Sequence, residues 1–527
     1  MTEGRGHGAL VAALSLFLVL IAVLHQISTR FGQGIFTYPL DDTYIHLALA
    51  KHFATGHGWG INADRFASCS SSPLWTMLLS AWMGVFGVGG EAPLLLATLF
   101  GMAAVVIGYR ALQQNVATPG LVWAALGLAI VAGPLATLSL SGLEHALQTA
   151  LTLAFVVECA DQISRKQDDF VRRARLAALA LLLGGVRYES LLLVGFACLL
   201  FAVRFRKLQF SIVLGLAGLA PVLAFGMWSR AHGWFFVPNS VLLKANVPTR
   251  ATSAARELVE TLLGVPHLLV LMLAAFALLI LTFVDRKRWS WSQVALGLFL
   301  VTSFLHVMLA RVGWLFRYEA YLVFMGVIVV AIALDEQRTR LWRPALAWRS
   351  LALAALLAVF VPLGHRAASA LVRTPWASKN IHDQQIQMGT FIARYYRGAG
   401  VGANDVGAIS YLGEVRTLDL FGLADFEVGR LKLYGVWNTE AMRQVTRERD
   451  VEVAVIYDEW FERYGGVPRE WVKAGEWTIA HNVVCGSDRV AWYAVDPAES
   501  APLLRHLRDF SSQLPTDVAQ SGAYRNP

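Results

Sequence analysis

The sequence predicts an α-helical protein that crosses a membrane many times, with about 11–13 transmembrane helices followed by a C-terminal soluble α/β domain. Two observations carry this prediction. The first is composition: of 527 residues, 56% are hydrophobic and 16% charged, and the mean hydropathy is +0.51. Soluble proteins carry about 25% charged residues. The second is a change of character near residue 365, after which charged residues reach an ordinary density.

The first 364 residues hold the apolar segments that are long enough, or nearly so, to cross a bilayer. They cover 9–27, 73–89, 92–112, 121–140, 143–160, 209–228, 265–284, 291–310, 318–334 and 348–364. The stretch 174–203 is broken by Arg187, Tyr188 and Glu189. We interpret it as two short crossings, because one helix of that length would span about 45 Å. The first segment could be a cleaved signal peptide, but it lacks a clear cleavage site, so we expect a retained span.

The basic residues lie in short clusters between apolar segments, at 165–175, 204–207, 286–288 and 338–349. This placement is typical of cytoplasmic loops, so the net charge of +8 does not indicate a nucleic-acid partner. Arg187–Glu189, the loops 229–264 and 311–317, and the chain after residue 365 should then lie outside. An internal N-terminus and an external tail require an odd number of crossings. The segments above total twelve, which is even, so one segment between 73 and 160 is not a simple crossing.

The predicted domains are a transmembrane domain over 1–364 with an outer loop at 28–72, an α/β domain over 365–510, and a flexible tail over 511–527. In the α/β domain we expect strands near 405–411, 415–421, 451–457, 477–485 and 489–495, and helices near 381–397 and 438–449. The glycines at 398, 400 and 402 lack the strand–turn–helix context of a nucleotide-binding loop.

The four cysteines are too scattered for a metal site or a disulfide framework. Cys159 and Cys198 fall in apolar segments and should be small core residues. Cys69 and Cys485 should both be external, so a bond between them is compatible with an oxidising compartment.

The acidic pair Asp41–Asp42 is the strongest candidate for chemistry. Two adjacent carboxylates at a membrane surface are costly to desolvate. Either could cap a helix that runs to about Phe53, whose apolar stripe of Ile45, Leu49 and Phe53 should face lipid. A cap needs only one aspartate. The pair therefore also fits a carboxylate base with a second carboxylate that orients it or helps to hold a metal.

The sequence around this pair resembles a known family. The acidic pair with Tyr44-Ile45 is followed by the turn Gly56-His57-Gly58, by Asn62 and by Ser72-Pro73-Leu74-Trp75. This order is similar to the first outer loop of the GT-C superfamily, the polyprenyl-phosphate-sugar-dependent membrane glycosyltransferases, and most of all to its arabinofuranosyltransferase-like branch. The serine run 68–72 departs from the usual loop and puts the shape of the acceptor side in question.

Weaker matches follow in family order over residues 35–425. They are Ser141-Gly142-Leu143-Glu144, Arg187-Tyr188-Glu189, Pro238-Asn239-Ser240 with Lys244, Arg317-Tyr318, Asp405-Val406-Gly407-Ala408-Ile409 and Asp419-Leu420-Phe421-Gly422-Leu423.

The resemblance implies a fold, a reaction and a location. Asp41 would be the catalytic base and Asp42 its partner in an inverting transfer of a monosaccharide from a polyprenyl-phosphate donor. A pentofuranose such as arabinose is the first expectation for the sugar, and an envelope glycan, a lipid or a protein for the acceptor. The enzyme would sit in a bacterial cytoplasmic membrane, surrounded by membrane lipid, with its active site and tail outside the cytoplasm.

The remaining site candidates have structural alternatives. Cations near the donor phosphate would be Lys244, then Arg317, Arg187, His57 and Lys51. Lys244 could instead be an interfacial lysine, and Arg187 with Glu189 is better explained as a buried ion pair than as catalysis. Acceptor or sugar contacts would come from Glu144, Tyr44, Trp75, Asn239 and Glu189. Trp59, Trp75, Trp234, Trp314 and Trp376 could stack on a sugar but are more simply explained as an aromatic belt.

No cofactor is certain. A divalent cation, Mg²⁺ or Ca²⁺, would be held by Asp41 and Asp42, with His46 one helical turn away. Two rival functions compete with the transferase. One is a secondary transporter or lipid-sugar flippase, which the missing internal repeat disfavours. The other is an inactive scaffold, which would not be expected to keep the acidic pair.

Overall fold

A computed structural model of the chain describes residues 3–167, 169–206, 208–244, 251–284, 289–341 and 346–525. The predicted basic positions Lys207, Arg286–Arg288 and Arg343 lie outside these residues. The chain divides into two compact units, which we describe separately. The helical unit comprises Met1–Leu24, Leu94–Ala224 and Ala245–Val372, and the α/β unit comprises His25–Pro93, Phe225–Lys244 and Arg373–Pro527.

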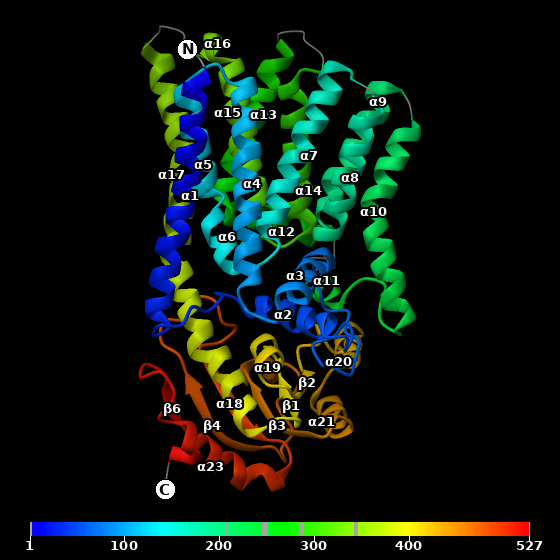
Figure 1. Ribbon diagram of the computed structural model, residues 1–527, viewed down its shortest axis with the longest axis vertical. Helices are drawn as coiled ribbons and strands as arrows, with labels where there is room; N and C mark the ends of the chain where they lie inside the picture. Colours follow the sequence, from blue (N-terminus) through cyan, green and yellow to red (C-terminus); the bar gives the residue numbers. More distant parts are fainter. Residues whose placement is uncertain are drawn as a thin grey trace. The chain divides into compact units, whose positions relative to one another are not determined.

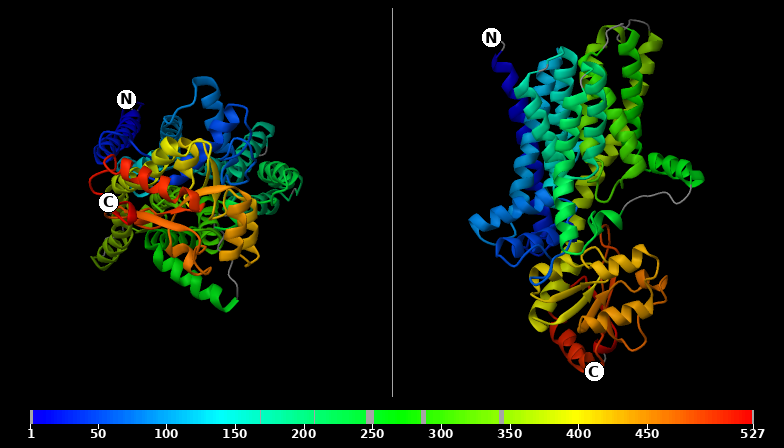
Figure 2. Two further views of the ribbon diagram at one scale, coloured as in Figure 1. Left: turned by 90° about the horizontal axis from the view of Figure 1, so that it is seen from below. Right: turned by 90° about the vertical axis from the view of Figure 1, so that its right-hand side faces the viewer.

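The helical unit is a bundle whose long helices run side by side in Figure 1 and in the right-hand view of Figure 2. Its elements are α1 (Glu3–Phe31), α4 (Ala92–Asn115), α5 (Pro119–Ala132), α6 (Leu135–Ser141), α7 (His145–Arg165), α8 (Phe170–Val186), α9 (Ser190–Phe205), α10 (Leu208–Ala231), α12 (Ala251–Gly264), α13 (Pro266–Val284), α14 (Trp291–Leu309), α15 (Ala320–Glu336), α16 (Arg338–Leu341) and α17 (Leu346–Ile381). Several, such as α1, α10 and α17, continue into the α/β unit.

Six helical segments of the described chain are long and apolar enough to span a bilayer. They are Gly8–Phe31, Ala92–Asn115, Pro119–Ser141, Leu208–Ala231, Pro266–Phe283 and Trp291–Leu309. The chain is therefore a multi-pass membrane protein, as its composition predicts. The predicted break at Arg187–Glu189 is also present, because α8 ends at Val186 and α9 begins at Ser190.

The two ends of the helical unit carry different polar residues. At one end Arg204 Nε donates to the Ile163 carbonyl at 3.0 Å, and Arg340 donates to the Leu281 carbonyl at 3.1 Å. At the other end Arg187 donates to Glu144 at 2.8 Å. The described basic clusters thus gather at one end and the Arg187 turn at the opposite end, which is the alternation that the charge pattern predicts.

Helix α3 (Pro73–Phe86) is the best candidate for the segment that does not cross. Its 14 residues give a length of about 21 Å, against a hydrocarbon core of about 30 Å. It belongs to the α/β unit, where it packs against α2 (Asp41–Ala54). Without α3 the predicted crossings are odd in number, as an internal N-terminus and an external tail would require.

The α/β unit is built on one six-stranded sheet in the order β2-β1-β3-β5-β4-β6 (Figure 1). The strands are β1 (Gly400–Ala403), β2 (Arg416–Asp419), β3 (Val451–Ile456), β4 (Val472–Thr478), β5 (Arg489–Ala494) and β6 (Ala519–Ser521). Strand β1 pairs in parallel with β2 and β3, whereas β3–β5, β5–β4 and β4–β6 are antiparallel. The predicted C-terminal α/β domain is confirmed.

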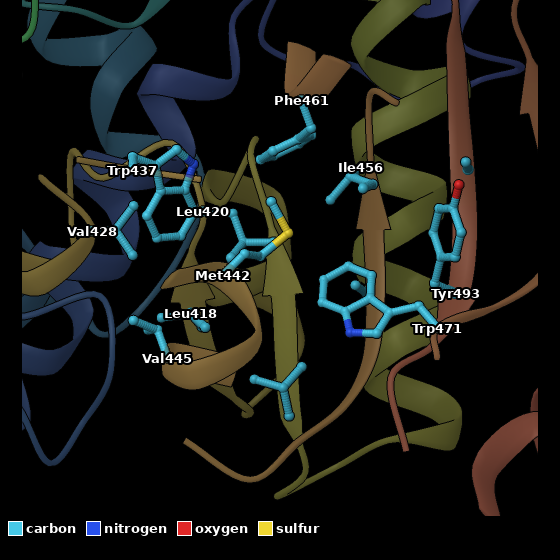
Figure 3. Packing of buried hydrophobic residues seen from close by; sticks show 13 residues of the cluster. Leu418, Leu420, Val428, Trp437, Met442, Val445, Ile456, Phe461, Trp471 and Tyr493 are labelled. Carbon is cyan, nitrogen blue, oxygen red and sulfur yellow. The ribbon is translucent and has the colours of Figure 1, made fainter. Parts of the chain in front are cut away.

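Helices pack around this sheet. They are the π-helical turn His382–Ile386, α18 (Gln387–Tyr395), α19 (Gly407–Leu412), α20 (Phe426–Leu433), α21 (Thr439–Glu448), α22 (Glu459–Glu462) and α23 (Ser500–Phe510), with short 3₁₀ turns at Pro497–Glu499 and Ala523–Arg525. Apolar side chains from β2, β3, α20 and α21 form one buried core, in which Leu420, Met442 and Ile456 are almost fully covered (Figure 3). The other elements of the unit are α2, α3 and the short α11 (Asn239–Leu242).

Three local predictions for the tail differ from the structure. The strand expected over 405–411 is instead helix α19, and the strand of that region is the glycine-containing β1 just before it. The strand expected over 477–485 lies earlier, as β4. The end of the chain, predicted as a flexible tail, forms β6 along β4, because Tyr524 is buried against Gly475 and gives the segment an apolar anchor.

The lipid-facing stripe predicted for α2 is wrong. Ile45 and Leu49 are buried at 9% and 0% exposure. Helix α2 packs against both α3 and α19, so its apolar face meets protein rather than lipid. Phe53 is the one residue of the proposed stripe that is exposed.

Candidate active site

The carboxyl ends of the parallel strands collect polar side chains at one edge of the sheet. Strand β1 leads into Asn404 and Asp405, and β3 leads into Tyr457. The Tyr457 hydroxyl donates to Asp405 at 2.6 Å, and the Tyr457 amide donates to Asn404 at 2.9 Å. Gln385 also donates to Asp405, at 2.9 Å. In the strand order, β1 is followed by β2 toward one edge of the sheet, and β3 by β4 toward the opposite edge. Ligands of α/β sheets bind in the crevice at such a switch point.

Asp41 is fixed at this edge by two backbone amides. Gly407 N–H donates to its Oδ2 at 2.7 Å, and Ala408 N–H donates to its Oδ1 at 2.9 Å. These amides belong to the first turn of α19, where a negative side chain is favourable. The capping role considered for this aspartate is therefore present, but for a helix far along the chain. In α2 itself the N-cap residue is Leu40.

The electrostatic environment of Asp41 opposes ionisation. Burial raises the pKa of its carboxyl, and the nearby Asp405 raises it further, while the two amide donors act in the opposite direction. Burial likewise raises the pKa of Asp405 against its bonds from Tyr457 and Gln385. A proton is therefore more readily held on Asp41 and on Asp405 than on a free aspartate.

Asp42 has a different environment from Asp41. Its Oδ1 lies 3.7 Å from Lys244 Nζ, and the side chains are 29% and 27% exposed. This separation is longer than a hydrogen bond, and both side chains keep part of their surface in contact with solvent. The predicted acidic pair and the first-ranked predicted phosphate contact are therefore neighbours.

The other predicted residues of this unit make structural contacts. Lys51 donates to the Tyr411 carbonyl at 3.2 Å, and His46 Nδ1 lies 2.8 Å from the Thr76 hydroxyl. The exposed His57 is 2.9 Å from the Thr55 hydroxyl.

The predicted sugar contacts of the α/β unit are also engaged. The Tyr44 hydroxyl accepts from the Tyr38 amide at 3.2 Å, and Trp75 is completely buried. Asn239 is buried and donates to the Gly422 carbonyl at 2.9 Å. These positions define the shape of the loops and offer little surface to a sugar.

A second polar group lies within the helical unit. Arg187 donates through Nε to Glu189 at 2.7 Å and through Nη1 to Glu144 at 2.8 Å, so the favoured ion pair is present and extends to a second glutamate. Arg317 donates to the Tyr318 hydroxyl at 3.0 Å, and its guanidinium lies 4.8 Å from the Tyr318 ring. The Arg187 guanidinium lies 5.6 Å from the same Tyr318 ring, so the predicted site residues of this unit form one cluster.

The chain is similar in structure to a solved membrane enzyme over nearly its whole length. ArnT from Cupriavidus metallidurans, bound to undecaprenyl phosphate, matches with a TM-score of 0.54 and 12% identity over 93% of this chain and 98% of ArnT. The apo state of the same enzyme matches with a TM-score of 0.52 and 14% identity, over 92% and 99% of the two chains. ArnT has the GT-C fold. This chain has the GT-C fold.

Other comparisons extend less far. The archaeal oligosaccharyltransferase AglB from Archaeoglobus fulgidus, in complex with an inhibitory peptide and a dolichol-phosphate, shows a TM-score of 0.48 and 11% identity over 92% of this chain and 74% of AglB. Residues 379–493 match a family described as a domain of unknown function, DUF8728. None of the curated proteins matches the sequence.

Some residues of this GT-C fold escape prediction from the sequence. Asp405 belongs to a motif that the family resemblance includes, but its closeness to Asp41 comes only from the sheet edge. In the helical unit Glu319 is fully buried and forms an ion pair with Arg366, and His267 Nε2 lies 3.3 Å from the same carboxylate. Glu319 directly follows the Arg317-Tyr318 motif, which was the one available signal.

The last predicted features of the site concern metal ligands and cysteines. Among those residues, no group of three or more His, Cys, Asp or Glu side chains is arranged to hold a metal ion. Cys69 and Cys485 are both buried free thiols and are not bonded to each other.

Proposed function

We propose that the chain is an inverting glycosyltransferase that moves a monosaccharide from a polyprenyl-phosphate donor to an envelope glycan, lipid or protein acceptor. The reaction would take place on the outer face of a bacterial cytoplasmic membrane. The observation that supports this most is the acidic pair at the sheet edge, with Asp41 fixed by the α19 amides and Asp42 beside Lys244. The shared GT-C fold supports a lipid-linked donor, since the ArnT structure is bound to undecaprenyl phosphate.

The proposed chemistry is a single displacement. The acceptor hydroxyl oxygen attacks the anomeric carbon, the bond from that carbon to the phosphate oxygen breaks, and the lipid phosphate leaves with the electron pair. The hydroxyl proton passes to Asp41. Two amide donors hold this carboxylate in place, and its raised pKa makes it a stronger base than a free aspartate. Asp42 would orient the acceptor hydroxyl.

Lys244 is the proposed contact for the donor phosphate. It is only partly exposed and lies near Asp42, so a phosphate that binds there would replace a weak carboxylate contact. Arg187 and Arg317 are secondary candidates, because their guanidiniums already bind Glu144, Glu189 and Tyr318. The resemblance of the first loop favours a pentofuranose such as arabinose as the transferred sugar.

The test is mass spectrometry of envelope glycans and lipid-linked sugars from cells that carry wild type, Asp41→Asn, Asp42→Asn or the control Asp509→Asn. Asp509 is exposed on α23 in the same unit. We expect Asp41→Asn to accumulate one lipid-phosphate sugar and to lose that sugar from a polymer, while the control does neither. Loss with Asp42→Asn alone would make Asp42 the base. Unchanged glycans in both variants, when gene deletion does change them, would refute the catalytic proposal and favour transport.

A further inference from the structure

The α/β unit contains a pocket that includes neither Asp41 nor Asp42. Its volume is about 250 Å³. Three separate stretches of the chain line it: residues 61–67 of the first loop, His232 with Trp234, and residues 416–418 and 424–426 with Arg449. This volume is somewhat below the roughly 300–1,000 Å³ of pockets for drug-sized ligands, which suits one sugar residue.

Hydrogen bonds hold the walls of this pocket together before any ligand arrives. Asn62 donates to the Thr417 carbonyl at 2.9 Å and accepts from the Thr417 amide at 2.8 Å, which locks the first loop onto β2. Asn239 joins the second stretch to both neighbours, because its amide donates to the Ser68 carbonyl at 3.0 Å and its side chain to the Gly422 carbonyl. Because these loops are already held in place, little conformational entropy is lost from them when a ligand binds.

Aromatic rings form one side of the pocket. The rings of Phe66 and His232 stack at 4.2 Å with an interplanar angle of 13°. Trp234 lies 6.1 Å from Phe66 and 5.6 Å from Phe426, measured between ring centroids. Apolar and aromatic walls with a few polar groups are typical of small-ligand sites. The C–H face of a sugar ring can pack against such a wall.

Three arginines line the pocket together with the carboxylates of Asp64 and Asp425, so cationic side chains are in excess there. Arg65, Arg416 and Arg449 line it, and the carboxylates nearest to their guanidiniums are 3.5, 3.8 and 3.6 Å away. These separations are longer than hydrogen bonds. Arg416 also donates through Nε to the Gly398 carbonyl at 3.4 Å, which leaves its two Nη groups for a ligand. Arginine is the residue of choice for planar, bidentate binding of carboxylate and phosphate groups.

We propose that this pocket binds a saccharide residue that carries a negatively charged group. If the proposed transferase function holds, the site would be a subsite for the acceptor and would make the enzyme selective for an acidic glycan. Arg65 and Arg416 bind the anionic group, and the wall of Phe66, Trp234 and Phe426 packs against the sugar ring. The anion can be a uronic acid carboxylate or a sugar phosphate, which share this chemistry.

The test measures binding to the full-length protein in lipid nanodiscs by isothermal titration calorimetry. The probes are digalacturonic acid, its carboxyl-reduced neutral form, galactose 6-phosphate and inorganic phosphate. The test variant is Arg65→Gln/Arg416→Gln, whose two side chains are about half exposed, so the fold should tolerate the change. The control is Arg397→Gln, an exposed arginine of the same unit that pairs with Glu414 outside the pocket. Thermal unfolding of each variant verifies folding.

We expect an acidic sugar to bind wild type and control alike, and to bind the double variant at least tenfold more weakly. Preference for digalacturonic acid identifies a uronic acid, and preference for galactose 6-phosphate a phosphorylated sugar. Equal binding of the neutral form, equal binding by a folded double variant, or equally tight binding of inorganic phosphate alone would overturn the proposal. The assay needs no turnover, so an inactive Asp41→Asn protein that still binds the acidic sugar separates this proposal from the catalytic one.

Discussion

Replacement of Gly407 by alanine should disable the proposed site through a single methyl group. A Cβ at this position would lie 2.2 Å from the backbone oxygen of Asp41 and 2.8 Å from its Oδ2. Comfortable contact requires about 3.5 Å, so α19 and the start of α2 would have to separate by about 1 Å. Both amide bonds to the carboxylate would then lengthen beyond hydrogen-bonding distance.

The size of the effect follows from these bonds. Because the raised pKa of Asp41 keeps much of this carboxyl protonated near neutral pH, each of the two bonds contributes about 0.5–1.5 kcal/mol there, so the variant should lose about 1–3 kcal/mol of local docking energy. Displacement of a catalytic group by about 1 Å costs roughly 100-fold in rate. We therefore expect Gly407→Ala to lower sugar transfer by about 100-fold and to reduce the thermal stability of the protein.

The assay compares lipid-linked sugar and envelope glycan in cells, and thermal unfolding of the purified protein, for Gly407→Ala and Gly84→Ala. Gly84 lies within α3, and a Cβ there would meet no heavy atom within 4 Å. The control should keep full transfer, with stability unchanged or raised by up to about 1 kcal/mol. If Gly407→Ala keeps both wild-type transfer and wild-type stability, the contact between α19 and Asp41 is not needed for the reaction.

Three further predictions address other parts of the molecule. Arg366→Ala removes the cationic partner of the buried Glu319, so unfolding in nanodiscs should show a loss of about 3–5 kcal/mol, whereas Arg256→Ala at an exposed pair should change nothing measurable. The raised pKa of Asp41 means that the base ionises only as pH rises, so measured transfer rates should increase through the neutral range. The same carboxyl contributes to the free energy of unfolding below its ordinary pKa, and this contribution is lost as pH rises through its raised pKa. Burial raises the pKa of Asp425 to about 6, so the affinity of the pocket for an acidic sugar should fall between pH 5 and 7 in calorimetry, and Asp425→Asn should flatten this dependence.

Local sequence signals predict much of this fold, and their failures have identifiable causes. The break at Arg187–Glu189 and strands β3 and β5 follow from patterns confined to neighbouring residues. Strand β1 escapes prediction because glycine disfavours strands in general. At Gly400 a Cβ would lie 2.1 Å from the Asp450 carbonyl, so tight packing selects the glycine that hides the strand.

The candidate site shows a second kind of failure. The spacing of Ile45, Leu49 and Phe53 predicts an amphipathic helix, but no periodicity tells whether lipid or protein covers the apolar face. The acidic pair stands out from its local sequence, whereas its partners Asp405 and Gly407 come from the far end of the chain. Only the pairing of the parallel strands brings these residues to one place.

The path of the chain through the α/β unit has a consequence for biogenesis. This unit is assembled from three stretches, His25–Pro93, Phe225–Lys244 and Arg373–Pro527, and the amides that hold Asp41 come 366 and 367 positions after it. Contacts of such long range form late, since a long loop must close first. During synthesis the acidic pair therefore stays unanchored until residue 408 has left the ribosome and the sheet has formed. A truncated or stalled chain would carry the proposed base without the geometry to use it. Sugar transfer from the lipid carrier would therefore be confined to chains that have folded completely.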